Sequence, residues 1–192
     1  IRHMVKQMVL GCGYGASANR FSIISGMDWQ EASNSVALYR SKMHSVCALW
    51  NNLQRKMHIA YSRGEEFVLQ LPSGRELNYG KIYTTLQDGR RNYVAKLTKG
   101  SKKVPIRLWG GLLAENFSQA LARDIFANML VEIEKQGIEI LFHVHDEFII
   151  ETDKNKAEET LEAVLKCMSE APDWITDIPL GAEGKVVARY EK

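Results

Sequence analysis

The spacing of apolar residues changes along the chain, from helical periodicity at its start to the alternation of strands in its middle. Helical spacing predicts four helices, at residues 2–14, 28–61, 112–136 and 156–171. Asp28 and Glu31 form a capping box at the start of the second helix. Gly137 is a C′ residue after the third helix, and Pro172 follows the fourth. The stripe expected to be buried on the second helix consists of Trp29, Leu38, Val46, Leu49, Trp50 and Leu53.

Runs of β-branched and aromatic residues between turn residues predict strands in the second third of the chain. These strands lie at residues 66–71, 75–79, 81–86 and 93–97. The turn Pro72-Ser-Gly separates the first two, and no internal repeat, low-complexity tract or clear linker interrupts the chain. Helices first and a mixed region afterwards predict the α+β fold class, with a helical part packed on a partial antiparallel sheet and long helices.

A short polar turn lies between two apolar runs in the last third of the chain. Ile138–Phe142 precedes this turn and Phe148-Ile-Ile follows it, which predicts a β-hairpin with buried strands. Asp146 and Glu147 would lie at its rigid tip, bracketed by two histidines. Hard cations such as Mg²⁺ take one or two carboxylates and complete their shell with water and substrate phosphates. The alternative is a pair of solvated acids in an ordinary turn.

Side chains of defined chemistry recur at every fourth position near the start of the chain. The recurring residues are Arg2, Lys6, Leu10 and Tyr14, and Gly15 follows. This spacing places them along one helical face, with each step about 6 Å along the axis. Two cations, an aliphatic side chain and an aromatic ring suit the phosphates, sugar and base of a nucleoside triphosphate. The alternative is an amphipathic helix whose cations are solvated.

Together the two motifs resemble the DNA polymerases of family A, the family of bacterial DNA polymerase I and its phage relatives. The Arg2–Gly15 motif resembles the nucleotide-binding helix of the fingers, and Val144-His-Asp-Glu147 resembles the palm hairpin that carries a catalytic carboxylate. Three further segments agree with the family pattern: Leu71-Pro-Ser-Gly-Arg75, Asn116-x2-Gln119-x4-Asp124, and the tail from Pro179 to Tyr190. The resemblance spans essentially the whole chain. It implies a fingers remnant at residues 1–65 and a partial palm with the catalytic hairpin at residues 66–192.

The resemblance implies that Asp146 and Glu147 are the catalytic and metal-binding residues. Two Mg²⁺ ions, with Mn²⁺ as a substitute, act in the complete enzyme, where Asp146 would be a main ligand and Glu147 would assist. The family carries a first metal-binding aspartate before the fingers helix, at which this chain begins. We therefore expect a C-terminal fragment that is inactive alone and needs the missing N-terminal half in cis or in trans. Ile1 in place of an initiator Met agrees with this, unless Ile-Arg-His-Met is a cloning remnant.

The remaining motif residues are implied to bind substrate. Those expected to bind dNTP are Arg2, Lys6, Leu10 and Tyr14. Those expected to contact primer-template DNA are Gly15, Asn116, Gln119 and His145. Three positions depart from the family pattern: Leu10 stands where Phe or Tyr is common, His143 where Gln is common, and Gly111 where Arg is common.

Charge is ordinary overall but uneven along the chain. The 192 residues are 45% hydrophobic and 25% charged, with a net charge of +2, which is typical of a globular protein. Residues 90–107 contain cations and no acid: Arg90, Arg91, Lys96, Lys99, Lys102, Lys103 and Arg107. Such a run suits a phosphate backbone and would make binding salt-dependent. A solvated hairpin loop around Gly100 is the alternative.

Cysteine use and hydropathy indicate where the protein works. Cys12, Cys47 and Cys167 are odd in number, widely scattered and without a metal-ligand spacing. This favours a reduced cytoplasmic setting, in a bacterium or a phage-infected host cell. No apolar run approaches the ~18 residues of a membrane span and no signal peptide is evident, so a membrane partner is not expected.

Two other functions stay open from the sequence. In one alternative, the chain is the C-terminal subunit of a naturally split polymerase. In the other, it is a metal-dependent phosphohydrolase that uses His143, His145, Asp146 and Glu147. The hydrolase would show phosphatase or nuclease activity without dNTPs, and it leaves the stripe from Arg2 to Tyr14 unexplained.

Overall fold

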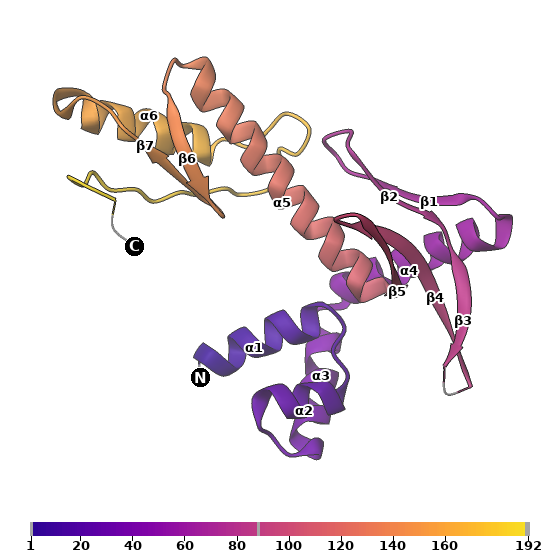
Figure 1. Ribbon diagram of the computed structural model, residues 1–192. Helices are drawn as coiled ribbons and strands as arrows, with labels where there is room; N and C mark the ends of the chain where they lie inside the picture. Colours follow the sequence, from indigo (N-terminus) through magenta and orange to yellow (C-terminus); the bar gives the residue numbers. More distant parts are fainter. Residues whose placement is uncertain (1, 88, 191–192) are drawn as a thin grey trace. The chain divides into compact units, whose positions relative to one another are not determined.

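The computed structural model describes residues 2–87 and 89–190, and Figure 1 shows the order of the elements. The helices are α1 (Arg2–Gly13), α2 (Ala18–Ser25), α3 (Trp29–Lys42), α4 (His44–Arg63), α5 (Gly110–Lys135) and α6 (Ala157–Ser169), with a short 3-10 helix at Lys154–Lys156. The strands are β1 (Glu66–Gln70), β2 (Glu76–Lys81), β3 (Tyr83–Gln87), β4 (Arg90–Lys99), β5 (Lys102–Leu108), β6 (Ile140–Val144) and β7 (Glu147–Ile150). Mixed helices and antiparallel sheets confirm the α+β class.

The chain forms two compact units, and α5 runs from one into the other (Figure 1). The first unit consists of Ile1–Gln70 with Glu76–Ser118, and the second of Leu71–Arg75 with Gln119–Lys192. The division expected at residue 65 concerns function rather than compactness, and it stays a prediction. No helix within the described ranges is both long and apolar enough to cross a membrane.

The first three helices pack around a small core in the first unit. Its buried members are Cys12, Phe21, Ala32, Val36 and Tyr39. Asp28 caps α3 as expected, because its carboxylate accepts a hydrogen bond from the Glu31 amide at 2.9 Å. The single long helix predicted after Asp28 is wrong, since the backbone leaves helical geometry at Met43 (φ −100°, ψ 48°) and α4 begins at the next residue.

The buried side chains of α3 and α4 also differ from the predicted stripe. Trp29 and Leu38 are each 56% exposed and Leu49 is 37% exposed, so the buried stripe expected across residues 29–53 is wrong for them. Leu53 is buried as predicted. Trp29 and Leu38 are nine positions apart on α3, which places them on opposite faces of that helix, and Leu49 lies beyond the break at Met43. On α3 the buried residues are instead Ala32, Val36 and Tyr39.

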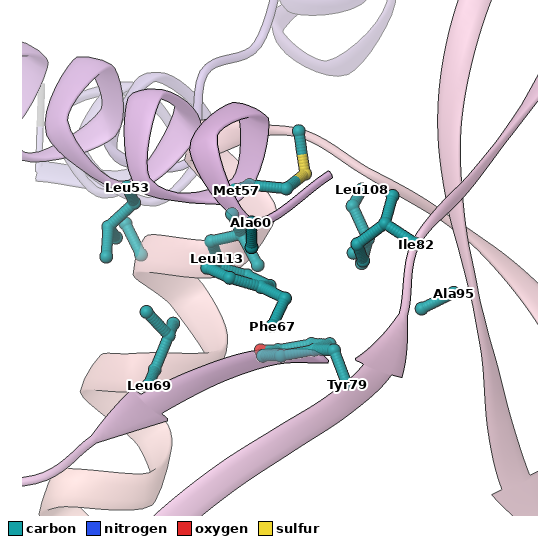
Figure 2. Close-up of a cluster of buried hydrophobic side chains, with 11 residues drawn as sticks. Leu53, Met57, Ala60, Phe67, Leu69, Tyr79, Ile82, Ala95, Leu108 and Leu113 are labelled. Atoms are coloured by element: carbon teal, nitrogen blue, oxygen red, sulfur yellow. The ribbon is translucent and has the colours of Figure 1, made fainter. Parts of the chain in front are cut away.

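The second core of this unit lies where α4 and the start of α5 meet the strands. Figure 2 shows Leu53, Met57 and Ala60 of α4 in one buried cluster with Phe67 of β1, Tyr79 of β2 and Leu113 of α5. β1 pairs with β2, and β3, β4 and β5 form an antiparallel sheet in that order. β5 was not predicted from the sequence, although Val104, Ile106 and Leu108 alternate along it. Its two lysines and Pro105 obscure that alternation, and Pro105 is tolerated because β5 is an edge strand.

The second unit is built on the later part of α5. Ile125, Phe126 and Met129 of α5 are buried in one cluster, and Ile133 packs with Val164 and Cys167 of α6 in another. Phe126 stacks on Phe148 of β7 with ring centroids 4.2 Å apart. α5 ends at Lys135, and Gly137 adopts φ 76° just after it, as its predicted C′ role requires.

Candidate functional site

α1 presents the predicted nucleotide-binding stripe. Arg2, Lys6 and Leu10 lie four residues apart on this helix and are exposed. Tyr14 and Gly15 follow its last residue in a turn and are half-buried, and Gly15 has a φ of 85° that suits glycine. Among the described residues, neither Arg2 nor Lys6 forms an ion pair. Both cations are therefore available to an anionic ligand.

The end of α1 is held by backbone contacts within the first unit. The indole nitrogen of Trp50 donates a hydrogen bond to the Gly13 carbonyl oxygen at 3.0 Å. At the start of α5, a Cβ on Gly111 would lie 2.8 Å from the carbonyl carbon of Tyr14 and would overlap its oxygen. Only glycine therefore fits at Gly111. The sequence signal for this contact was the Gly-Gly pair at the start of a helix.

Gly110, at the start of α5, also approaches a backbone carbonyl group closely. Its amide donates to the side-chain oxygen of Gln54 at 2.7 Å, which satisfies one of the unpaired amides at the α5 N-terminus. A Cβ on Gly110 would lie 2.8 Å from the carbonyl carbon of Trp50. The residue that anchors Gly13 is thus itself in contact with α5, and sequence reasoning assigned neither Gln54 nor Gly110 to the site.

Asn116 and Gln119, the two α5 residues predicted to contact DNA, differ in their surroundings. The amide nitrogen of Asn116 donates to the Tyr79 hydroxyl at 3.0 Å. Burial raises the pKa of Tyr79, so this hydroxyl stays protonated over the ordinary pH range. Asn116 is thus tied to the core of the first unit, whereas Gln119 is exposed.

The turn Leu71–Arg75 is fastened to α5 within the second unit. The Arg75 guanidinium donates from Nε to Asp124 Oδ1 at 2.7 Å and from Nη2 to the Ala120 carbonyl oxygen at 3.1 Å. The Ser73 hydroxyl donates to the other carboxylate oxygen of Asp124. Asp124 is only 11% exposed, so this acid is almost fully enclosed by its donors. The sequence identified Arg75 and Asp124 as motif residues without pairing them.

The hairpin of residues 140–150 forms where the sequence predicted it. β6 and β7 pair with Val144 opposite Glu147, and the turn contains His145 and Asp146. His145 has a φ of 56°, the only positive φ among the described residues other than glycine, and such strained positions cluster at functional sites. His145, Asp146 and Glu147 are all exposed.

The expectation that both hairpin strands are buried is wrong. Leu141 is 51% exposed and Phe142 is 46% exposed. The reason is that the sheet has two strands, and its larger packing clusters lie on the side of Phe148 and Ile150. Phe142 meets the edge of the Tyr190 ring, with centroids 5.9 Å apart, and this contact leaves it exposed. Apolar composition predicted burial, but it could not show how lightly Phe142 is covered.

Asp146 and Glu147 suit a hard cation by chemistry, because each offers exposed carboxylate oxygens at the hairpin tip. Across residues 2–87 and 89–190, no group of three or more His, Cys, Asp or Glu is arranged to hold a metal ion. Two acids alone would make up only part of a coordination shell. The four-residue metal site of the hydrolase alternative is not assembled.

Comparison with known proteins gives a consistent family. The family model of DNA polymerase family A matches residues 1–192. The DNA polymerase of Bacillus phage SP02 is 38% identical across 98% of this chain and 32% of its own length. The thermostable DNA polymerase I of Thermus filiformis is 25% identical across 95% of this chain and 20% of its own length.

A solved structure shares the fold. The POL domain of Pol1 from M. smegmatis, in complex with DNA primer-template and dNTP, superposes with a TM-score of 0.65 and 22% identity. The match covers 93% of this chain and 28% of that one. This chain thus spans a third or less of the length of each of these three proteins.

Proposed function

The chain belongs to DNA polymerase family A, and from this premise we propose that it is the fingers-to-palm part of a DNA-directed DNA polymerase. The activity is nucleotidyl transfer, in which deoxynucleotides extend a primer 3′ end. One observation carries the proposal: the exposed Arg2–Lys6–Leu10 stripe ends in an anchored Tyr14, in the same chain as a hairpin tipped by two carboxylates. The M. smegmatis structure, which contains primer-template and dNTP, supports these partners.

We assign the incoming dNTP to the exposed face of α1. Arg2 offers a planar fork and Lys6 a compact point charge, and together they would neutralise the β- and γ-phosphates. Leu10 would meet the sugar. Tyr14 would offer its ring to the nascent base pair, and Gly15 would let the DNA approach closely because it has no side chain.

Asp146 and Glu147 would hold the divalent cation of the reaction, Mg²⁺ or in its place Mn²⁺. When bound, a pair of such ions stabilises the attacking and leaving oxygens of phosphoryl transfer. The primer 3′ oxygen bonds to the α-phosphorus of the dNTP as pyrophosphate leaves. Two acids do not complete such a site, so we assign its remaining ligands to residues outside these 192, in cis or in trans.

The primer-template would lie along residues of α5 and the hairpin turn. His145 would hold the primer terminus, and Gln119 would reach the minor groove of the duplex. Asn116 would contribute through its carbonyl oxygen, because its amide nitrogen is already bonded to Tyr79. We place this work in the cytoplasm of a bacterium or a phage-infected host cell.

The test is Asp146→Ala in a complete polymerase that contains this chain. Primer extension should be abolished while affinity for primer-template, measured by fluorescence anisotropy, stays within about twofold, because removing one exposed acid leaves the fold intact. Asp153→Ala is the matched control, since Asp153 is an exposed acid beyond the end of β7. Equal loss of synthesis and DNA binding would instead assign Asp146 a folding role.

The isolated 192 residues give the second arm of this test. They should show no primer extension with Mg²⁺, dNTPs and primer-template, because the metal shell is incomplete. Template-directed synthesis by the isolated chain would overturn the need for further residues. Hydrolysis of phosphoesters without dNTPs would favour the hydrolase instead.

A further inference from the structure

Positive charge is concentrated in the three-stranded sheet of the first unit. Residues 83–108 contain seven cations and one acid, a net charge of +6, whereas the whole chain has a net charge of +2. The other 166 residues are therefore net negative, at −4. The hairpin expected around Gly100 is present, and it extends over two strands. The cations lie on β4 and β5, and Gly100 occupies the tight turn between those strands.

Strand alternation places three of these cations on one face of the sheet. Tyr93, Leu97 and Ile106 pack against the core of the unit, so the residues between them point to the opposite, outer face. The register sets Lys96 beside Pro105, midway between Lys103 and Arg107. We call Lys96, Lys103 and Arg107 the cationic row.

The cationic row has a regular spacing. Successive members are offset by two residues along the strands, which is about 6.6 Å at 3.3 Å per residue, and they alternate between β5 and β4. All three side chains are exposed. Within the part of the chain that the structure describes, none of them forms an ion pair.

An open hollow adjoins one end of the row. Lys96 and Lys103 line it together with Lys81, Glu66 and Tyr83. Glu66 is the Cα partner of Lys81 in the β1–β2 pair, so the charges of these two offset each other locally. Lys96 lies over the ring of Tyr83, 5.5 Å from its centroid, which leaves its ammonium group at the surface. The net charge of the hollow is therefore positive.

Such a row suits a repeating anion better than a single small one. Unpaired like charges on neighbouring strands destabilise a sheet unless something neutralises them. Lysine acts as a point charge without the planar fork that reads a particular group, so two lysines and one arginine favour binding that is independent of sequence. The face offers no exposed cluster of aromatic rings for stacked bases, since Tyr83 is covered by Lys96.

We propose that the cationic row on the outer face of the β3–β4–β5 sheet binds the phosphate backbone of nucleic acid, as a contact separate from the nucleotide-binding face of α1. The proposed polymerase function supplies the identity of the polyanion, and to that extent the proposal rests on it. The site fixes the path of the strand and reads no bases. Single-stranded and duplex DNA share this chemistry.

The test is DNA binding by the 192-residue chain without dNTP or metal. Fluorescence anisotropy of a labelled single strand and of the matching duplex would be followed between 50 and 300 mM NaCl, a range of about sixfold chosen for its effect on phosphate contacts. We expect affinity to fall less steeply with salt in the triple variant Lys96→Ala, Lys103→Ala, Arg107→Ala. The magnitude of the slope of log affinity against log salt should decrease by about 3, one for each lost phosphate contact. A larger change with the duplex assigns the row to duplex DNA, and the reverse assigns it to a single strand.

A matched control removes the same charge from exposed cations on α3 and α4: Lys42→Ala, Arg55→Ala, Lys56→Ala. This control should leave the slope unchanged. If the alanine triple variant unfolds, glutamine at the same three positions keeps much of each stem and removes only the charge. Melting temperature and far-UV circular dichroism identify which variant set is folded.

Several results would overturn the proposal. They are absence of binding by the parent chain at 50 mM NaCl, an unchanged slope in the triple variant, and equal losses in variant and control. Competition by polyglutamate as strong as that by DNA would assign the row to an acidic protein segment instead. The Asp146→Ala test measures synthesis and is independent of these readouts, so failure of either proposal can be told from failure of the other.

Discussion

The end of α1 and the tip of the β6–β7 hairpin both carry residues proposed for synthesis, but the chain supports them in different ways. Tyr14 is held through backbone contacts that admit only glycine at Gly111, and Trp50 hydrogen-bonds the preceding carbonyl. The hairpin is held by side-chain packing on one face, where Phe148 stacks on Phe126. Its other side exposes Phe142.

This difference shows which of the two regions is better supported by packing within these residues. A two-stranded hairpin is marginal by itself and gains stability from a packed face. The α1 end is enclosed by its neighbours, whereas one side of the hairpin is covered lightly, by the edge contact between Phe142 and Tyr190. The hairpin that carries the two carboxylates is therefore the less firmly supported of the two regions.

The largest effect should come from removing the packing under the hairpin. Phe126→Ala deletes a buried ring that contacts Phe148 and meets His143 edge-on at 5.6 Å between centroids. A buried Phe→Ala change costs about 3–5 kcal/mol. We expect hydrogen exchange at β6 and β7 amides to accelerate strongly while α1 amides keep their protection.

Phe142→Ala is the control for that change, because it deletes the same side chain from an exposed position of the same hairpin. Its free energy of unfolding should change by less than about 1 kcal/mol. If Phe126→Ala accelerated exchange equally in α1 and in the hairpin, the contrast between the two regions would be wrong.

The next effect concerns the α1 end. Gly111→Ala would drive a Cβ into the Tyr14 carbonyl, and relief requires a backbone shift worth about 3 kcal/mol, at the upper end for overpacking. Gly11→Ala on α1 is the matched change, since its Cβ would meet only Phe21 at 3.7 Å and Ala16 at 3.9 Å. It should stabilise by about 0.5–1 kcal/mol through helix propensity. Urea unfolding measures the change in the free energy of unfolding, which should be opposite in sign for the two variants. Changes of the same sign would contradict the close approach at Gly111.

Much of this site was predictable from the sequence because its evidence is local. The four-residue repeat from Arg2 to Tyr14 specifies a helical face, and the apolar runs around His145 specify a hairpin. Both elements formed with bounds close to those predicted. The roles of Arg2, Lys6 and Asp146 rest on family membership and stay predictions.

Contacts between distant segments could not be predicted in this way. The bond from Trp50 to Gly13 and the pairing of Arg75 with Asp124 join residues 37 and 49 positions apart. Neither proline nor glycine marks the break at Met43, so the helix expected there looked continuous in the sequence. Exposure of Phe142 depends on which neighbours are present, which composition does not encode.

A smaller effect should follow loss of the polar contact that fastens the Leu71–Arg75 turn. Asp124→Ala removes a nearly buried acceptor of bonds from Arg75 and Ser73, and hydrogen bonds to charged groups contribute about 1.5–3 kcal/mol. We expect a loss of about 2 kcal/mol in urea unfolding. Glu132→Ala breaks an exposed ion pair with Lys135 on the same helix and should cost less than about 0.5 kcal/mol. If the two substitutions cost the same free energy of unfolding, enclosure of Asp124 would add nothing to the strength of its bonds.

The smallest effect tests the core beside the α1 end. Tyr79→Phe removes the acceptor of the Asn116 bond and should cost about 1 kcal/mol at pH 7.

Burial raises the pKa of Tyr79, so the folded state keeps a proton that the unfolded chain releases near pH 10. That contribution is complete below about pH 10 and is lost as pH rises through the raised pKa. Between pH 9.5 and 11 (about the range of tyrosine titration), the parent should therefore lose stability more steeply than Tyr79→Phe. Burial also raises the pKa of Tyr39, which remains in both proteins, so the variant keeps part of the slope. Parallel curves of stability against pH would show that Tyr79 has the same pKa in the folded and unfolded states. The Asn116–Tyr79 hydrogen bond would then lie in a hydrated environment, unlike the close contact of Gly111 with Tyr14.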